Sequence, residues 1–427
     1  MPEVADSILK REVSATNGSG SSAMGPWLHV TVFLASALLI VSHRPEAITN
    51  PQFWAEDGVL WYAQAHNLGW REVLFQPVAG YLCTLPRLTA ALAQLLPLAA
   101  GPLLFNAVAI FVQVLTVSFF LSSRFHSLGR LPTRLLFGFL YLALPNSFEV
   151  TANITNTQWH LAILLCLVAI AEPATSAWWR CFDIAVIVLA SLTGPFAILL
   201  WPLAVLVWGW KRRNRWTLTL LFTLTACVLI QLGTLLRTGN AARVHGSLGA
   251  NPLLFARLLA SRVFLAALVG RNNLSDGHSH TFEVVLITVA GILVLLYSLL
   301  KAPWELKLFT AFASLALAAA LLNPMAPPPK WPALLNPWCT RYWLLPMLAF
   351  VAGLLWIAGE GHPKGIRLAA VAALVFMSVG IVRDWKHPRF TDMHFGVYAQ
   401  QYSDLPKGSA LTIPLNPPGW SMTLTKR

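Results

Sequence analysis

The sequence predicts an all-α protein that crosses a membrane many times. Of its 427 residues, 56% are hydrophobic and only 11% are charged, and the mean hydropathy is +0.62. An ordinary soluble chain carries about 25% charged residues, so this chain cannot cover a water-facing surface of its own size. Soluble enzymes, nucleic-acid-binding domains and disordered scaffolds are therefore disfavoured. The net charge of +13 is explained first by membrane topology, with no nucleic acid as partner.

Eleven apolar segments are candidates for spanning helices. A span needs about 20 apolar residues, and fewer where helices pack within protein. The candidates run over 26–43, 101–123, 134–149, 158–173, 180–193, 195–210, 216–236, 281–300, 306–323, 341–358 and 367–383. Thr193-Gly194-Pro195 separates two of them, and this pair is either two spans with a tight turn or one broken helix, because Gly-Pro interrupts helical hydrogen bonding.

The basic residues orient these spans. With the N-terminus in the cytoplasm, Lys and Arg collect in the inner segments, whereas the short outer loops near 150–157 and 324–341 hold only Lys330 and Arg341. This is the positive-inside pattern of a multi-pass membrane protein.

The same pattern divides the chain into three parts. Residues 1–25 are polar and rich in Gly and Ser, which is typical of a disordered cytoplasmic tail. Residues 26–383 form the membrane domain, with a first outer loop at 44–100 and a long outer loop at 237–280. Residues 384–427 form a short outer C-terminal segment, in which a short helix and then an extended stretch are expected. This segment acts either as a flap over the outer face or as a packed strap.

One pair of acidic residues is the main catalytic candidate. Among seventeen Asp and Glu residues, only Glu56 and Asp57 are adjacent, and aromatic residues flank them in the first outer loop. In the simpler interpretation, Asp57 caps the start of an interfacial helix that ends near Gly69, and Glu56 is solvated. In the functional interpretation, burial among aromatics and a like-charged neighbour raise a carboxylate pKa toward the range of a general base.

Other outer segments carry polar groups suited to a substrate. They are Gly80-Tyr81 with Pro86-Arg87, the amide-rich run from Asn153 to His160, and Arg341-Tyr342. Each also has a structural interpretation, as a snorkelling arginine, a helix cap or a headgroup anchor. The long outer loop adds Arg243 and Arg262.

Together these motifs resemble the GT-C superfamily, the multispan glycosyltransferases that use polyprenyl-phosphate sugars. The resemblance rests on Phe53-Trp54-Ala55-Glu56-Asp57-Gly58, Gly80-Tyr81, Pro86-Arg87, Asn156-Thr157-Gln158-Trp159 and Arg341-Tyr342, and it is closest to a bacterial group. It implies a GT-C-like fold in the cytoplasmic (inner) membrane, with interfacial helices and an active site on the outer, periplasmic face. It also implies cell-envelope polysaccharide biosynthesis as the setting, with membrane lipids around the protein.

The resemblance implies an inverting sugar transfer to an outer-face glycan or lipid acceptor. Asp57, slightly ahead of Glu56, acts as general base. Arginine is suited to the leaving phosphate. The donor-phosphate and substrate-binding residues are then Tyr81, Arg87, Asn156, Gln158, Trp159, His160, Arg243, Arg262, Arg341 and Tyr342. A divalent cation, Mg²⁺ or Mn²⁺, between Asp57 and the phosphate stays open, although no second outer carboxylate has the spacing to argue for it.

Three other activities remain as alternatives. A flippase or transporter of lipid-linked glycans predicts ionisable residues near the middle of spans. A polysaccharide polymerase or ligase relies on Arg and His in a large outer loop, which here means Arg243, His245 or Arg262. An acyltransferase would use His160 as its base.

Overall fold

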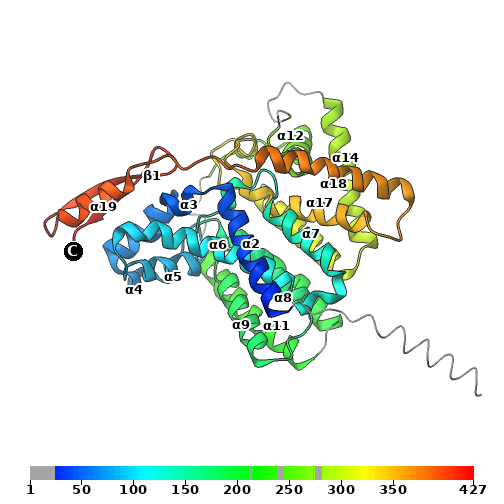
Figure 1. Ribbon diagram of the computed structural model, residues 1–427, viewed down its shortest axis with the longest axis horizontal. Helices are drawn as coiled ribbons and strands as arrows, with labels where there is room; N and C mark the ends of the chain where they lie inside the picture. The colour runs from blue at the N-terminus through cyan, green and yellow to red at the C-terminus, as the bar shows by residue number, and fades with distance from the viewer. Residues whose placement is uncertain (1–24, 212–213, 239–244, 273, 275–280) are drawn as a thin grey trace, which may run out of the picture.

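In a computed structural model, every predicted span corresponds to a helix (Figure 1). The structure describes residues 25–211, 214–238, 245–272, 274 and 281–427. The helices that match predicted spans are α2 (Pro26–His43), α6 (Gly101–Phe120), α7 (Leu131–Leu142), α8 (Thr157–Ile170), α9 (Ala177–Ser191), α10 (Phe196–Leu206), α11 (Arg215–Thr238), α14 (Thr281–Lys301), α15 (Trp304–Leu322), α17 (Leu344–Ile357) and α18 (Lys364–Asp384). The disordered tail predicted for 1–25 lies outside the described residues except for Gly25. Arg243, a predicted substrate-binding residue, also lies outside them.

The structure supports a polytopic membrane protein. Within the described ranges, seven helical stretches are long and apolar enough to cross a membrane: Leu98–Phe120, Arg215–Thr238, Pro252–Val269, Thr281–Lys301, Trp304–Leu322, Thr340–Ile357 and Lys364–Asp384. Four more apolar helices are shorter, at Trp27–His43, Leu131–Leu142, Thr157–Ile170 and Phe196–Gly209. Helix α9 belongs to neither group. The membrane class is thus supported, while a count of eleven spans is not established.

Two helices form the centre of the bundle. Helices α8 and α17 are apolar on all sides, and nearly all of their residues are buried. A helix without a polar face is surrounded either by other helices or by lipid, and the burial of α8 and α17 shows that other helices surround these two. Helices α6, α9, α10 and α15 pack against α8, and α14, α15 and α18 pack against α17.

The chain turns define two ends of the bundle. At the end that we call the site end, α7 is joined to α8 and α15 to α17. At the opposite end, α6 is joined to α7, α14 to α15 and α17 to α18. The Gly-Pro pair proves to be a turn between two separate helices, because α9 ends at Ser191 and α10 begins at Phe196. Gly194 lies in this turn at φ +97°, a conformation that favours glycine.

One long helix lies within the segment that the sequence analysis assigned to the long outer loop, 237–280. It consists of α12 (Pro252–Leu258), a π-helical segment (Leu259–Phe264) and α13 (Leu265–Val269). Near its start, Phe255 contacts the ring of Trp331, which follows α15, and just after its end Arg271 N donates to the Asp384 carboxylate at 3.2 Å. Asp384 also accepts from Asn146 N, which follows α7. Both ends of this apolar helix therefore lie at the site end.

The first loop and the C-terminal segment form a structured layer at the site end. The first loop contains α3 (Glu46–Thr49), π-helical segments at Asp57–Tyr62 and Ala65–Gly69, α4 (Trp70–Val73) and α5 (Thr84–Ala93). The C-terminal segment contains α19 (Phe395–Asp404) and an antiparallel hairpin of β1 (Ala410–Leu415) and β2 (Trp420–Thr425). Figure 1 shows this segment, in red, beside the first loop, in blue. The expected helix and extended stretch are confirmed, and across the described residues the fold is all-α apart from this hairpin.

Candidate functional site

The acidic pair lies where two loops distant in sequence meet. Asp57 begins the π-helical segment of the first loop and is completely buried. Its carboxylate accepts hydrogen bonds from Ile154 N at 3.1 Å, from Thr155 N at 2.9 Å and from Thr155 Oγ1 at 2.6 Å. Trp61 Nε1 donates to the same hydroxyl at 2.8 Å. The interpretation that Asp57 caps its own helix is therefore wrong. Its carboxylate instead holds the loop after α7.

The surroundings of Asp57 favour its protonated form. Burial raises the pKa of this carboxyl from its ordinary value of 3.8 to about 7, although the bonds from Thr155 and Ile154 act in the other direction. The charge of Glu56 adds to the increase. Glu56 itself is only partly buried. Of the two carboxylates, Glu56 is the one that a molecule from outside can reach.

The raised pKa predicts a pH-dependent contribution to stability. Between pH 3.8 and about 7, the unfolded chain has lost the Asp57 proton that the folded chain keeps. Rising pH therefore favours unfolding over this interval and has no further effect through Asp57 above it. We expect the Tm of the wild type, measured in detergent micelles, to fall relative to that of Asp57→Asn as the pH rises from 4 to about 7. A difference that stays constant over this range would contradict the assignment.

The amide-rich loop is held together by its own side chains. Asn153 and Asn156 both donate to the carbonyl oxygen of Glu149, at 2.6 and 3.0 Å, and Asn153 Oδ1 accepts from Asn156 N. His160 is buried, with Nε2 2.9 Å from Val150 O and Nδ1 2.7 Å from the Tyr141 hydroxyl. Both ring nitrogens are thus engaged. Asn156 and His160 shape the loop that holds Asp57, and this geometry gives His160 no access to an acyl donor.

Arg44 is a further residue that the sequence analysis did not single out. It directly follows α2 and is buried, and its guanidinium donates to Phe148 O and Thr151 O, both at 3.2 Å, and to Pro388 O at 3.1 Å. It therefore joins the loop after α7 to the C-terminal segment. The one sequence signal was an arginine at the outer end of a span, which is more commonly a headgroup anchor.

A third carboxylate, Glu149, completes the acidic group. It forms an ion pair with the Arg341 guanidinium and accepts from Arg341 N at 2.9 Å. Burial raises the pKa of Glu149, Arg341 lowers it, and the Glu56 charge raises it slightly, so Glu56 acts on both buried carboxyls. The Arg341 side chain is 26% exposed and lies over the Tyr342 ring. Part of this guanidinium can meet an anion from outside.

Several predicted substrate-binding residues are buried in structural roles. Arg87 is 1% exposed, stacks over Trp61 and donates to Leu60 O and Gln64 Oε1 at 3.1 and 2.8 Å, so it holds the π-helical segment and is not open to a phosphate. Tyr342 accepts from Met325 N at 2.9 Å.

The other predicted residues also contact protein. Trp159 packs between the rings of Phe196 and Tyr342. Gln158 lies against Gly194, where an added Cβ would be 2.4 Å from its Oε1. Tyr81 pairs with Val78 in a tight turn. Arg262 lies in the π-helical segment of the long helix at the site end. It is 4% exposed and donates to Leu335 O.

The C-terminal segment forms one wall of the site. Asn416, at the end of β1, bridges to Trp54, and Ala55 N donates to its carbonyl oxygen. An added Cβ on Gly58 would lie 2.4 Å from Leu415 Cδ1, so glycine next to the acidic pair lets the hairpin approach. The segment is therefore packed on the site, as both the flap and the strap interpretations predict.

An exposed aromatic residue flanks the acidic group. Trp338 is 46% exposed and lies 6.1 Å from Trp54 and 5.4 Å from Phe148, measured between ring centroids. Trp54 is two residues before Glu56, and Phe148 directly precedes Glu149. An accessible indole beside carboxylates offers a flat apolar surface next to hydrogen-bonding groups.

The carboxylates do not fit a divalent cation. Mg²⁺ and Mn²⁺ take oxygen ligands, mainly carboxylates. Both oxygens of Asp57 accept protein hydrogen bonds, and both oxygens of Glu149 face Arg341, so only Glu56 has oxygens to offer. Among the residues that the structure describes, no group of three or more His, Cys, Asp or Glu side chains could hold a metal ion.

Comparison with known proteins adds no further assignment. No protein-family model matches the chain, and no curated protein matches it. Fold alone does not define a function in any case, and the chemistry of the site decides what the protein can do.

Proposed function

We propose that this protein is a GT-C-type membrane glycosyltransferase that moves a sugar from a polyprenyl-phosphate donor to an outer-face glycan or lipid acceptor. One observation carries the proposal. Glu56, a reachable carboxylate, lies at one end of an apolar helix bundle beside the enclosed Asp57 and the Glu149–Arg341 ion pair. Lipid-linked substrates are drawn from the bilayer, and sugar transfer needs both a base and a cation for the departing phosphate.

The residues divide into two roles in this reaction. Glu56 takes the proton from the acceptor hydroxyl, and the acceptor oxygen bonds to the anomeric carbon. The bond from that carbon to the phosphate oxygen breaks on the opposite face, and its electron pair leaves with polyprenyl phosphate. This single displacement inverts the anomeric centre. Arg341, whose guanidinium is partly exposed, meets the negative charge that develops on the phosphate.

Asp57 is a positioning residue in this scheme. Its bonds to Ile154 and Thr155 fix the first loop to the loop after α7, and thereby fix the neighbouring Glu56 relative to Arg341. This assignment reverses the preference for Asp57 as base, because a completely buried carboxyl cannot touch an acceptor without movement of the loops. In the proposed setting, the site end is the periplasmic face of the bacterial inner membrane, and the N-terminus is cytoplasmic.

Reconstitution tests the proposal directly. The purified protein in proteoliposomes is given polyprenyl-phosphate sugars labelled in the sugar, together with a lipid and glycan extract as acceptor. We expect labelled acceptor and free polyprenyl phosphate in equal amounts, with the anomeric centre inverted by NMR. Passage of the labelled lipid across the bilayer without transfer would identify a flippase instead. Growth of one lipid-linked glycan on another would identify a polymerase.

A further inference from the structure

Four aromatic rings from four segments form a row beside the acidic group. Trp54, in the first loop, lies 5.9 Å from Phe390, in the C-terminal segment, and 6.1 Å from Trp338, in the loop between α15 and α17, measured between ring centroids. Phe148, in the loop after α7, lies edge-on to Trp338 at 5.4 Å. The other three rings are at most 9% exposed, whereas Trp338 is 46% exposed. The row therefore ends in one open indole.

The indole of Trp338 is held in place before any ligand arrives. Two buried rings pack against it, and Trp338 N donates to Asn336 Oδ1 at 2.9 Å. Trp27 and Trp178, at the starts of α2 and α9, are mostly exposed, as headgroup anchors are. A side chain that is already ordered loses less conformational entropy when a ligand binds. Trp338 is thus suited to stacking against a substrate.

The two ring contacts join Trp338 to residues close to carboxylates. Trp54 is two residues before Glu56, and Phe148 directly precedes Glu149. Since Glu56 is the base of the proposed reaction, the acceptor hydroxyl must come within hydrogen-bond reach of it. A sugar ring carries hydroxyls around its edge and C–H groups on its face, so it can contact an indole and a carboxylate at once.

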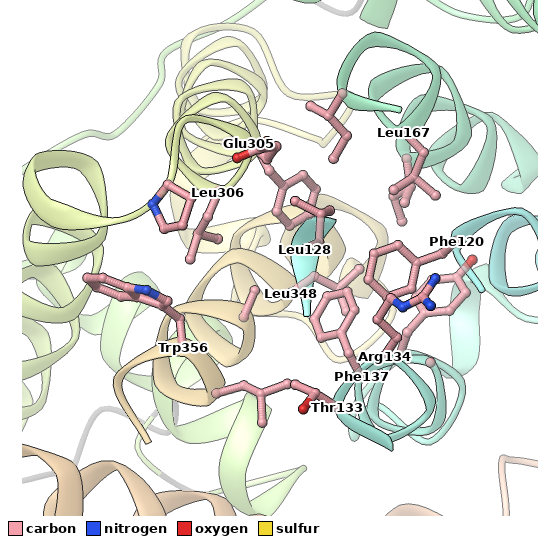
Figure 2. A pocket seen from close by; sticks show the side chains of 18 of the residues that line it. Phe120, Leu128, Thr133, Arg134, Phe137, Leu167, Glu305, Leu306, Leu348 and Trp356 are labelled. Atoms are coloured by element: carbon pink, nitrogen blue, oxygen red, sulfur yellow. The ribbon is translucent and has the colours of Figure 1, made fainter. Parts of the chain in front are cut away.

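The pocket at the opposite end of the bundle does not offer such a surface (Figure 2). It has a volume of about 360 Å³ and lies between α6, α7, α8, α15 and α17. Its walls are mainly apolar, with Phe120, Phe137 and Leu348 among them, and the acidic group is not part of its lining. The hydroxyls of a sugar would lose hydrogen bonds to water there. This pocket is therefore unsuited to a sugar, and Trp338 is the better surface for one.

We propose that the acceptor hydroxyl belongs to a pyranose sugar ring, and that the C–H face of this ring stacks on the open indole of Trp338. The inference rests on the proposed function and deepens it, because it selects a sugar acceptor over a lipid alcohol. The positively polarised C–H groups meet the negative face of the indole. One ring hydroxyl gives its proton to Glu56, its oxygen bonds to the anomeric carbon of the donor, and polyprenyl phosphate departs with the electron pair.

Fluorine NMR tests the stacking without any need for transfer. The full-length protein is labelled with 5-fluorotryptophan and kept in a detergent that has no sugar headgroup, and Trp338→Phe identifies the Trp338 signal. The probes are the methyl pyranosides of glucose, galactose, mannose and N-acetylglucosamine, with glycerol as control. We expect at least one pyranoside to shift the Trp338 signal in a saturable way, while glycerol leaves it in place. No shift with any pyranoside, or an equal shift with glycerol, would overturn the proposal.

Transfer kinetics assign the stacked ring to the acceptor. Trp338→Ala should raise the KM of the acceptor about tenfold, because an aromatic contact and its buried area are lost. The kcat and the KM of the polyprenyl-phosphate sugar should stay nearly unchanged, since the contact is made equally before and during the reaction. Trp70→Ala removes a 39% exposed indole from the first loop and should keep wild-type kinetics. A raised KM for the donor alone would contradict the assignment.

The two experiments separate this inference from the proposed function. A saturable Trp338 shift in a protein that transfers no sugar would support the sugar site and refute the glycosyltransferase. Sugar transfer with no Trp338 shift, and with a wild-type acceptor KM in folded Trp338→Ala, would refute the sugar site alone. If Trp338→Ala does not fold, the NMR result on the wild type decides.

Discussion

Glu56→Gln is expected to lower the rate of sugar transfer by about 10²- to 10⁴-fold, the usual contribution of a general base. Glutamine keeps the size and polarity of the side chain but cannot take the acceptor proton. Because Glu56 is partly exposed and forms none of the hydrogen bonds that hold the two loops, the variant should fold with an unchanged Tm. The kcat should therefore fall much more than the KM of either substrate rises.

Two comparisons make this result specific. Glu72→Gln changes an exposed carboxylate in the same loop and should retain full activity. Asp57→Asn should also reduce transfer, but with a changed KM, because it loosens the loop that positions Glu56. If Glu56→Gln retains full activity while Asp57→Asn loses it, the base is Asp57 and the loops must open during the reaction. Full activity in both variants would eliminate the acidic pair from the mechanism.

The second large effect concerns stability at the opposite end of the bundle. Arg124 and Asp183 form a buried bidentate ion pair with distances of 2.5 and 3.0 Å, and Arg124 also donates to Glu172 O at 2.8 Å. Asp183→Asn leaves the guanidinium buried without its counter-charge. We expect a loss of about 3–5 kcal/mol in the free energy of unfolding, visible as a large fall in Tm in detergent micelles.

A double variant identifies the cause of that loss. Arg124→Met combined with Asp183→Leu removes both charges and should recover most of the stability, since apolar residues of similar size often replace a buried ion pair without penalty. Arg180→Gln, at an exposed position on α9, should have little effect. If the double variant is as unstable as Asp183→Asn, the ion pair is not the reason for the effect.

Apolar segments predicted the helices well because burial in a bilayer and burial in a bundle select the same residues. The helix Pro26–His43 was predicted to its exact ends. The largest boundary error among the predicted spans was at 134–149, where the helix ends at Leu142 and a tight loop follows, with Asn146 and Ala152 at positive φ. Hydropathy does not report such a loop, because its residues are buried by neighbouring segments and its polar groups are satisfied locally.

The sequence could predict several residues of the candidate site, but not the contacts between them. Sequence alone predicted that Glu56, Asp57 and Arg341 lie on the same side of the membrane. It could not show that Asp57 binds Thr155, which lies 98 residues further along the chain. Arg87 and Glu149 show the physical reason: a charged residue near the end of a span can be interfacial or enclosed, and only the packing shows whether it is paired and buried.

The contact between β1 and the first loop determines when the site can exist during synthesis. Trp54 and Asn416 bridge across about 360 residues of sequence. At about 5–20 residues per second, a ribosome needs roughly 20–70 s to travel from one to the other. Throughout that time the first loop has been translated while the segment that covers it has not. Premature termination before β1 would therefore leave the first loop without the segment that packs on it.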